Sequence, residues 1–354
     1  MKKLSFTLLA IFGCLCYAFT QGTISGIVID AETKSPLEGA SVFAQNTTIG
    51  AVTKSDGSFK LPLQRGGYEL IVSFTGYVIQ TFKIEGTENR TLEIELQKED
   101  KSMSEVVVVA SNEVPDGWEK YGTFFTDHFI GNTPFAKETV LDNPEALKFY
   151  YSKRNEKLRV LATEPLRISN HSLGYNLHYN LDSFVFFERT KINSYRGNCL
   201  YIEMEGTYDQ HQQWKENREK AYIGSRLHFL RSYYDSTLKE EGFTVDILSN
   251  NDSRKFNRLM NPYDSTYYHS QEEEVELWFP KKASITYNKN KPEDEYLVQM
   301  KLPVDVKVQI SYVDLIDAIV LKQNGYFFDQ KSWINQGYWS WKNLADQLPY
   351  DYVP

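Results

Sequence analysis

Seven short segments with the alternating pattern of β-strands lie between residues 22 and 98, and they constrain the fold of this chain more than any other feature. They cover residues 23–30, 40–45, 50–53, 58–63, 68–74, 77–84 and 90–97. Turn residues separate them at hairpin spacing, and Asp56-Gly57 can supply the positive φ of a tight turn. Strands at this spacing predict a β-sandwich of two sheets.

The first twenty residues have the three parts of a secretory signal peptide. Lys2 and Lys3 are positively charged, residues 4–17 are mostly apolar, and Ala18-Phe19-Thr20 places small residues at a cleavage site. An uncleaved anchor or a lipid attached at Cys14 are the alternatives. No later run is as long and apolar as the roughly 20 residues of a membrane-spanning helix. We therefore predict an exported protein with no transmembrane span in the mature chain.

Charge and cysteine content exclude several classes of protein. The net charge of −8 argues against nucleic acid or an anionic membrane surface as the main partner. Cys14 and Cys16 leave with the signal peptide, so Cys199 remains alone and no internal disulfide can form. Because Cys199 lies in an alternating apolar pattern, we expect a buried strand thiol and not a nucleophile.

The segment of short strands also carries a family resemblance. Its motifs are Gly26-Ile27-Val28-Ile29-Asp30 and those within residues 36–42, 53–59 and 68–77. Together they resemble the carboxypeptidase regulatory-like domain, which implies a transthyretin-like or immunoglobulin-like fold without an active site. In Gram-negative bacteria such domains precede outer-membrane transporters and many envelope proteins. The resemblance implies a location in the periplasm or at the outer membrane, and it does not imply peptidase activity.

Residues 99–116 form a predicted linker that contains the apolar strand Val106–Val109. This strand resembles the segment that TonB-dependent transporters present for energy coupling, and an extended strand can add to the sheet edge of a partner. We favour pairing within the same protein, because the residues that follow are too few for a transporter barrel of about 22 strands.

Residues 117–354 predict a larger β-rich α+β domain with one long amphipathic helix at about 212–241. Apolar residues recur on one face of this helix, and Gly242 is placed to cap its end. Basic residues lie on its other faces, namely Arg218, Lys220, Arg226 and Arg231. They could form a site for an anion or a partner, or they could be a solvated face of the helix. We favour the solvated face. The predicted strands include 158–162, 166–168, 175–181, 183–190, 197–205, 244–248, 275–278, 284–287, 297–300, 306–311 and 318–321.

This second region resembles a group of envelope proteins that are named only for their N-terminal regulatory-like domain. The resemblance rests on Gly117-Trp118, Asn143-Pro144-Glu145, Leu173-Gly174-Tyr175 and the chain end at 345–354. It implies no reaction and no catalytic residue.

A search for catalytic motifs finds none with the required spacing. His269-Ser270-Gln271-Glu272 has the short zinc-carboxypeptidase spacing, but no histidine follows it to complete the site. A zinc site with its ligands in another order along the chain would need His171, His178 or His228, and the spacing of these residues does not support one. Glu203 and Glu205 lie two apart on a predicted strand, and nothing selects them as a glycosidase pair. We predict no catalytic, cofactor-binding or metal-ligating residues and no bound cofactor.

Aromatic residues near the end of the chain are the strongest candidates for a binding surface, because aromatic faces can stack on sugar rings. We favour core packing for them. They are Tyr326, Phe327, Phe328, Trp333, Tyr338, Trp339 and Trp341.

The sequence as a whole predicts a non-enzymatic envelope protein that docks on another envelope protein or a glycan. The alternatives are an extracytoplasmic hydrolase of peptides or glycans and an accessory to a TonB-dependent transporter.

Overall fold

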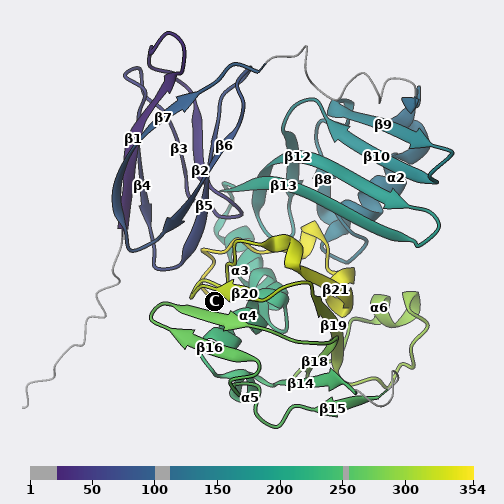
Figure 1. The fold of residues 1–354 in the computed structure, drawn as a ribbon. Coiled ribbons are helices and arrows are strands. Elements are labelled where there is room, and N and C mark those ends of the chain that lie inside the picture. Colours follow the sequence, from purple (N-terminus) through teal and green to yellow (C-terminus); the bar gives the residue numbers. More distant parts are fainter. Residues whose placement is uncertain (1–21, 100–111, 250–254) are drawn as a thin grey trace, which may run out of the picture.

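The computed structural model describes residues 22–99, 112–249 and 255–354. The predicted signal peptide and the Val106–Val109 strand lie outside these ranges. Figure 1 shows three β-rich parts around a central group of helices and the C-terminal segment. The prediction of a mainly β chain, with a seven-stranded region followed by a β-rich α+β region, is confirmed.

The N-terminal part, here called the sandwich, contains seven strands in two sheets. One sheet has the order β4-β1-β7, with β1 parallel to β7 and antiparallel to β4. The other has the order β3-β2-β5-β6 and is antiparallel throughout. Their bounds are β1 Gly22–Asp30, β2 Ser41–Ala44, β3 Gly50–Val52, β4 Ser58–Leu63, β5 Gly67–Ser73, β6 Gln80–Glu85 and β7 Asn89–Leu96.

Alternation along the strands builds the sandwich core. In β7, Leu92, Ile94 and Leu96 are buried while the residues between them are exposed. The turn before β4 follows the predicted chemistry, because Gly57 has φ +74° and the Asp56 carboxylate accepts a hydrogen bond from the Ser58 N–H.

The second part, called the middle unit, is a six-stranded sheet with a helix packed on it. The sheet has the order β8-β11-β12-β10-β9, and β13 pairs with β12. The helix, α2, places Phe125 and Phe129 in the core of this unit. Its elements are α2 Gly117–Phe129, β8 Thr139–Leu141, β9 Leu147–Ser152, β10 Lys157–Ala162, β11 Leu166–Asn170, β12 Tyr175–Phe187 and β13 Ile192–Glu203, with 3-10 turns at Ala136–Glu138 and Pro144–Ala146.

The prediction of a single long helix at 212–241 is wrong, because this stretch forms three helices. They are α3 Tyr208–Tyr222, α4 Arg226–Tyr234 and α5 Leu238–Glu241. Gly224 has φ +76° and Ser236 has φ +58°, and a left-handed residue ends an α-helix. Ser225 then caps α4 by accepting from the His228 N–H. The predicted cap at Gly242 is confirmed, with φ +91°.

The third part, called the C-terminal unit, has one sheet of five strands and one of three. Their orders are β15-β14-β18-β19-β21 and β16-β17-β20. The elements are β14 Phe243–Leu248, β15 Phe256–Arg258, β16 Tyr268–Gln271, β17 Glu274–Leu277, β18 Ala283–Tyr287, α6 Asp294–Gln299, β19 Gln309–Leu315, β20 Ile319–Leu321, β21 Trp333–Gly337 and α7 Tyr338–Trp341, with 3-10 turns at Gln330–Ser332 and Leu344–Asp346.

The strand predicted at 297–300 is also wrong, because α6 covers most of it. The acidic residues Asp294 and Glu295 lie in the first turn of α6, and they favour a helix start there more than the short apolar pair Leu297-Val298 favours a strand. Core packing of the late aromatic residues is confirmed. Phe328 is half-buried and the other six are buried, with exposed fractions of 6% or less.

The sandwich is bound to the C-terminal unit by a loop that follows β20. Lys322 is buried and forms ion pairs with Glu85 of β6, at 2.6 Å, and with Glu274 of β17, at 2.5 Å. Asn324 exchanges two hydrogen bonds with the backbone of Gly67. These contacts place the sandwich against the rest of the molecule.

The last eleven residues, called the end segment (344–354), run between the parts, and the C-terminus lies beside the sandwich (Figure 1). The Tyr350 N–H donates to the Asn46 carbonyl, and the Asp351 carboxylate accepts from the backbone and hydroxyl of Thr48. From the other side, the Arg231 guanidinium of α4 donates to the carbonyls of Tyr350 and Tyr352. The end segment therefore connects the sandwich to the helices.

Candidate functional site

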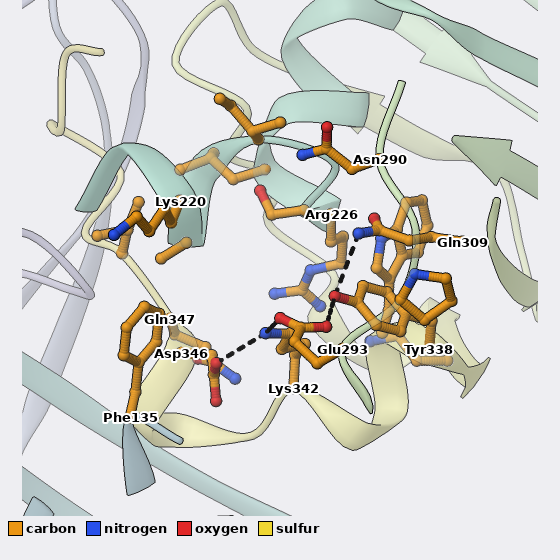
Figure 2. A pocket seen from close by; sticks show the side chains of 18 of the residues that line it. Phe135, Lys220, Arg226, Asn290, Glu293, Gln309, Tyr338, Lys342, Asp346 and Gln347 are labelled. Carbon is orange, nitrogen blue, oxygen red and sulfur yellow. Dashed lines mark hydrogen bonds and ion pairs between the residues drawn. The ribbon is translucent and has the colours of Figure 1, made fainter. Parts of the chain in front are cut away.

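A cavity of about 620 Å³ lies where the parts meet, and we take it as the candidate functional site (Figure 2). The sandwich contributes Asn46, the middle unit contributes Phe135 and Tyr201, and the end segment contributes Tyr350 among others. The remaining walls come from α3, α4 and the C-terminal unit. No one part of the chain could form this cavity alone.

A continuous series of polar contacts forms one side of the cavity. The Tyr338 hydroxyl donates to Glu293, whose other oxygen accepts from the Lys342 ammonium group at 2.5 Å. Lys342 also donates to Asp346 at 3.1 Å, and Asp346 accepts from the Thr133 hydroxyl at 2.7 Å. Figure 2 shows this series passing from Tyr338 through Glu293 and Lys342 to Asp346.

Lys342 is the one cation in this series of contacts and lies between the two carboxylates. Burial lowers the pKa of Lys342, but the carboxylates of Asp346 and Glu293 outweigh burial and raise it above its ordinary value. Burial raises the pKa of Asp346, although Lys342 and the Thr133 hydroxyl act in the opposite direction. Both carboxylates are therefore held by donors of the protein itself.

Apolar and aromatic side chains form other walls of the cavity. Trp339 is buried, and its indole N–H donates to the carbonyl of Gly224. Gln309 is also buried and donates through its amide nitrogen to Tyr338 and to the Lys291 carbonyl, while its Oε1 has no hydrogen-bond partner among the described residues. The apolar lining includes Phe135, Ile223, Leu227, Leu230 and Leu348.

Basic residues outnumber acidic ones around the cavity. Five Lys or Arg side chains line it, against the two acids Glu293 and Asp346. Lys289 and Lys291 lie on an exposed loop and have carboxylate partners at 4.0 and 2.9 Å. The side chains of Lys220 and Arg226 have no hydrogen bond or ion pair to any described residue. These two cations are available to a ligand.

The four basic residues predicted on the helix faces have two different roles. Arg218 donates to the carbonyls of Leu173 and Gly174 and to Glu203, and Arg231 donates to three backbone carbonyls. Both hold elements together. The expectation of a solvated face is therefore wrong for these two residues. Lys220 and Arg226 instead line the cavity, and Lys220 is exposed there.

The other residues that the sequence singled out do not converge. His269 is exposed on β16, whereas His228 is buried beside Glu241. Within the ranges that the structure describes, no group of three or more His, Cys, Asp or Glu side chains is placed to hold a metal ion. Glu203 is engaged by Arg218.

Cys199 is fully buried on β13, as expected for a strand thiol. Burial raises the pKa of this thiol well above its ordinary value. The protonated form is therefore favoured, and a thiol in that form is a poor nucleophile.

Several cavity residues were missed by the sequence analysis, namely Glu293, Gln309 and Lys342. They are far apart in the chain, and no motif relates their spacing. The one local signal was the polar loop at 288–293, where three of six residues are Lys or Glu between a strand and a helix.

Comparison with known families confirms the identity of the sandwich. The CarboxypepD_reg-like domain matches residues 24–108. A stretch of 98 residues is 36% identical to the TonB-dependent receptor SusC of Bacteroides thetaiotaomicron. This stretch is 27% of the present chain and 9% of SusC, so the chain spans only a small part of that relative. Both matches fit an envelope protein.

Solved structures that resemble the chain include some that match about a fifth of it and one that matches 67% of it, with a TM-score of 0.20. A cohesin–X-dockerin complex from Acetivibrio cellulolyticus matches 22% of this chain and 59% of its own, with 24% identity and a TM-score of 0.20. A streptococcal ancillary pilin matches 23% of this chain and 31% of its own, with 20% identity and a TM-score of 0.20. These TM-scores are too low to establish a shared fold. Among the described residues, no helix is long and apolar enough to cross a membrane.

Proposed function

We propose that this chain is a non-enzymatic envelope protein that acts by binding, and that the cavity between its parts is the binding site. The proposal rests on which side chains line the cavity and on how its two carboxylates are bonded. Of the described residues that line it, none is a histidine or cysteine, and both carboxylates are already bonded to Lys342. A general base must lie within hydrogen-bond reach of the proton that it abstracts, and here both acids are engaged by the protein's own cation. This lining offers shape, charge and apolar surface instead.

The proposed location is the periplasm or the outer-membrane surface of a Gram-negative bacterium. The CarboxypepD_reg-like match and the similarity to SusC support it. The proposed partner is another envelope protein or a glycan. The sandwich would be more than a spacer, because it contributes Asn46 to the cavity and holds the end segment.

Crosslinked retention of envelope components by the purified full chain tests the binding role. Two variants should obstruct the cavity. Ile223→Trp should fill it, because Ile223 is a half-buried lining residue, and Asn290→Trp on the exposed loop should narrow its entrance. We expect one component to be retained by the unmodified protein and lost by both variants, each checked for a normal thermal transition. Equal retention by all three proteins would place the binding site elsewhere.

A panel of peptide, ester and glycoside substrates tests the absence of catalysis. We expect no turnover above that of a heat-denatured sample. Turnover that disappears in Glu293→Gln would overturn the proposal and support the hydrolase alternative, because Glu293 is the less buried of the two carboxylates in the cavity.

A second candidate function is an accessory to a TonB-dependent transporter. The match to the receptor SusC favours it. Copurification of a transporter with the full chain, and its loss when Val106–Val109 is replaced by a Gly-Ser segment of equal length, would support this function over the first.

A further inference from the structure

We propose that the cavity binds a small organic anion, whose acidic group contacts Arg226 and Lys220 and whose apolar body contacts Trp339 and its neighbours. This inference rests on the proposed binding function and names the class of ligand. Its first support is the contrast in charge. The chain as a whole carries −8, yet the side chains that line the cavity carry five positive charges against two negative ones. A cleft lined by one sign of charge concentrates ions of the opposite sign.

The second support is the lack of partners for two of the cations. Lys342 is balanced by Glu293 and Asp346, and Lys291 by Asp294. Arg226 is half-buried, Figure 2 shows its guanidinium group within the cavity, and no described carboxylate or carbonyl accepts from it. A partly buried guanidinium group without an acceptor loses hydration without compensation, and an anionic ligand would supply that acceptor.

The third support is the backbone around Arg226. The first residues of α4, Arg226 and Leu227, line the cavity, and their N–H groups have no hydrogen-bond partner among the described residues. Free N–H groups and the positive end of the helix dipole favour an anion at this position. The helix start and the two side chains therefore present donors on one wall of the cavity.

The size and the opposite walls define the rest of the ligand. A volume of about 620 Å³ is in the range of sites for small molecules, roughly 300–1,000 Å³. Trp339 is buried, whereas Phe135, Ile223 and Leu227 are half-buried and present apolar surface to the cavity. An acid with a ring or short apolar body fits these walls, and carboxylates, phosphate esters and sulfate esters share the anionic oxygen atoms that Arg226 would bind.

Two fluorescent probes with the same aromatic body test the inference. Anilinonaphthalene sulfonate carries one negative charge, and N-phenyl-1-naphthylamine is its neutral counterpart. We expect the sulfonate to bind the full chain at least about tenfold more tightly, with a preference that weakens as salt is added. Benzoate, phenyl phosphate and phenyl sulfate should then compete with it, and their order identifies the acidic group.

Variants locate the bound probe. Arg226→Met and Lys220→Met should each weaken sulfonate binding by about tenfold and leave the neutral probe unaffected. Lys220 is exposed, so its variant tests the site even if Arg226→Met does not fold. Lys239→Met, an exposed lysine on α5 outside the cavity, is the matched control.

Equal affinity for both probes, no sulfonate binding, or unchanged binding in both variants would overturn the anion assignment. None of these results affects retention of an envelope component by the unmodified protein, so failure of the ligand class is distinguishable from failure of the binding function.

Discussion

At the scale of single residues, Asp30 shows how one carboxylate can organise the edge of the sandwich. It ends β1 and accepts hydrogen bonds from the Tyr77 hydroxyl at 2.6 Å and from the N–H groups of Glu32 and Thr33. The Tyr77 bond, followed by the Thr33 N–H, lowers the pKa of Asp30 well below its ordinary value. Asp30 and Tyr77 belong to the motifs that identified the domain, so these two motif positions serve a hydrogen-bond network.

The network predicts a loss of stability in acid. Because the folded protein favours the ionised form, Asp30 stabilises it above the unfolded pKa of about 3.9, and this contribution is lost as the pH falls toward the folded pKa. Tyr77→Phe removes the largest cause of the shift. We expect its thermal midpoint at pH 7 to fall by roughly 5 °C and its loss of stability below pH 4 to be smaller than in the unmodified protein.

Thermal unfolding followed by circular dichroism between pH 7 and pH 2 measures both effects. Tyr208→Phe is the control, because Tyr208 is 76% exposed and its hydroxyl has no hydrogen-bond partner in the part of the chain that the structure describes. A Tyr77→Phe profile parallel to that of the unmodified protein would contradict the proposed linkage.

At the scale of elements, the break between α3 and α4 decides where the cavity's cations lie. In a continuous helix, Lys220 and Arg226 would lie on the surface of the same helix, and no helix N-terminus would lie between them. Gly224 turns the chain, its N–H donates to Nδ1 of His228, and its carbonyl accepts from Trp339. The neutral His228 ring then donates through Nε2 to Glu241, at 3.1 Å.

Gly224→Ala should therefore be costly for two reasons. A left-handed conformation costs a non-glycine residue about 1–2 kcal/mol. The added Cβ would also lie 2.5 Å from Gln309 Oε1, so Gln309 would have to move. We expect the free energy of unfolding to fall by roughly 2–4 kcal/mol in urea denaturation.

Gly76→Ala separates the two causes. Gly76 has φ +84°, and an added Cβ would meet nothing within 4 Å. Its variant should show only the conformational cost of about 1–2 kcal/mol. Equal losses in the two variants would show that the contact with Gln309 is unimportant.

At the scale of the whole molecule, the end segment and the Lys322 loop hold three parts in one arrangement. Arg231 donates to the carbonyls of Asn324, Tyr350 and Tyr352 at 3.1, 2.9 and 2.8 Å, so it bonds both connecting segments at once. The end segment in turn bonds Asn46 and Thr48 of the sandwich. The cavity walls therefore depend on contacts between residues that are far apart in sequence.

Arg231→Met should loosen this arrangement without unfolding the separate cores. Removal of three charge-assisted hydrogen bonds should cost roughly 2–4 kcal/mol, because the carbonyls lose buried or half-buried donors. We expect calorimetry to separate the sandwich transition from the rest, and small-angle scattering to show a larger radius of gyration.

Lys239→Met controls for the loss of a positive charge near the helices, since Lys239 is exposed on α5. An unchanged scattering profile and a single transition in Arg231→Met would show that the parts are held mainly by other contacts, such as those of Lys322.

The sandwich could be predicted from the sequence because its determinants are local. Alternation in β7 and the Asp56-Gly57 turn each involve residues within a few positions of one another. Helix α2 was not predicted, since Gly117 and Gly122 lower helix propensity. The structure explains these glycines, because an added Cβ would lie 2.7 Å from Phe149 and 2.8 Å from Trp118.

The sequence by itself determined the alternation of strands and turns, the domain motif and the burial of Cys199, all of which follow from short-range periodicity and turn chemistry. Only the tertiary structure decided that Arg226 and Lys220 lie in a cavity while Arg218 and Arg231 hold the backbone. The physical reason is that a charged side chain on a helix has the same local pattern in either role. Arg231 donates to the carbonyls of Asn324, Tyr350 and Tyr352, and only packing over long sequence distances brings these acceptors to it.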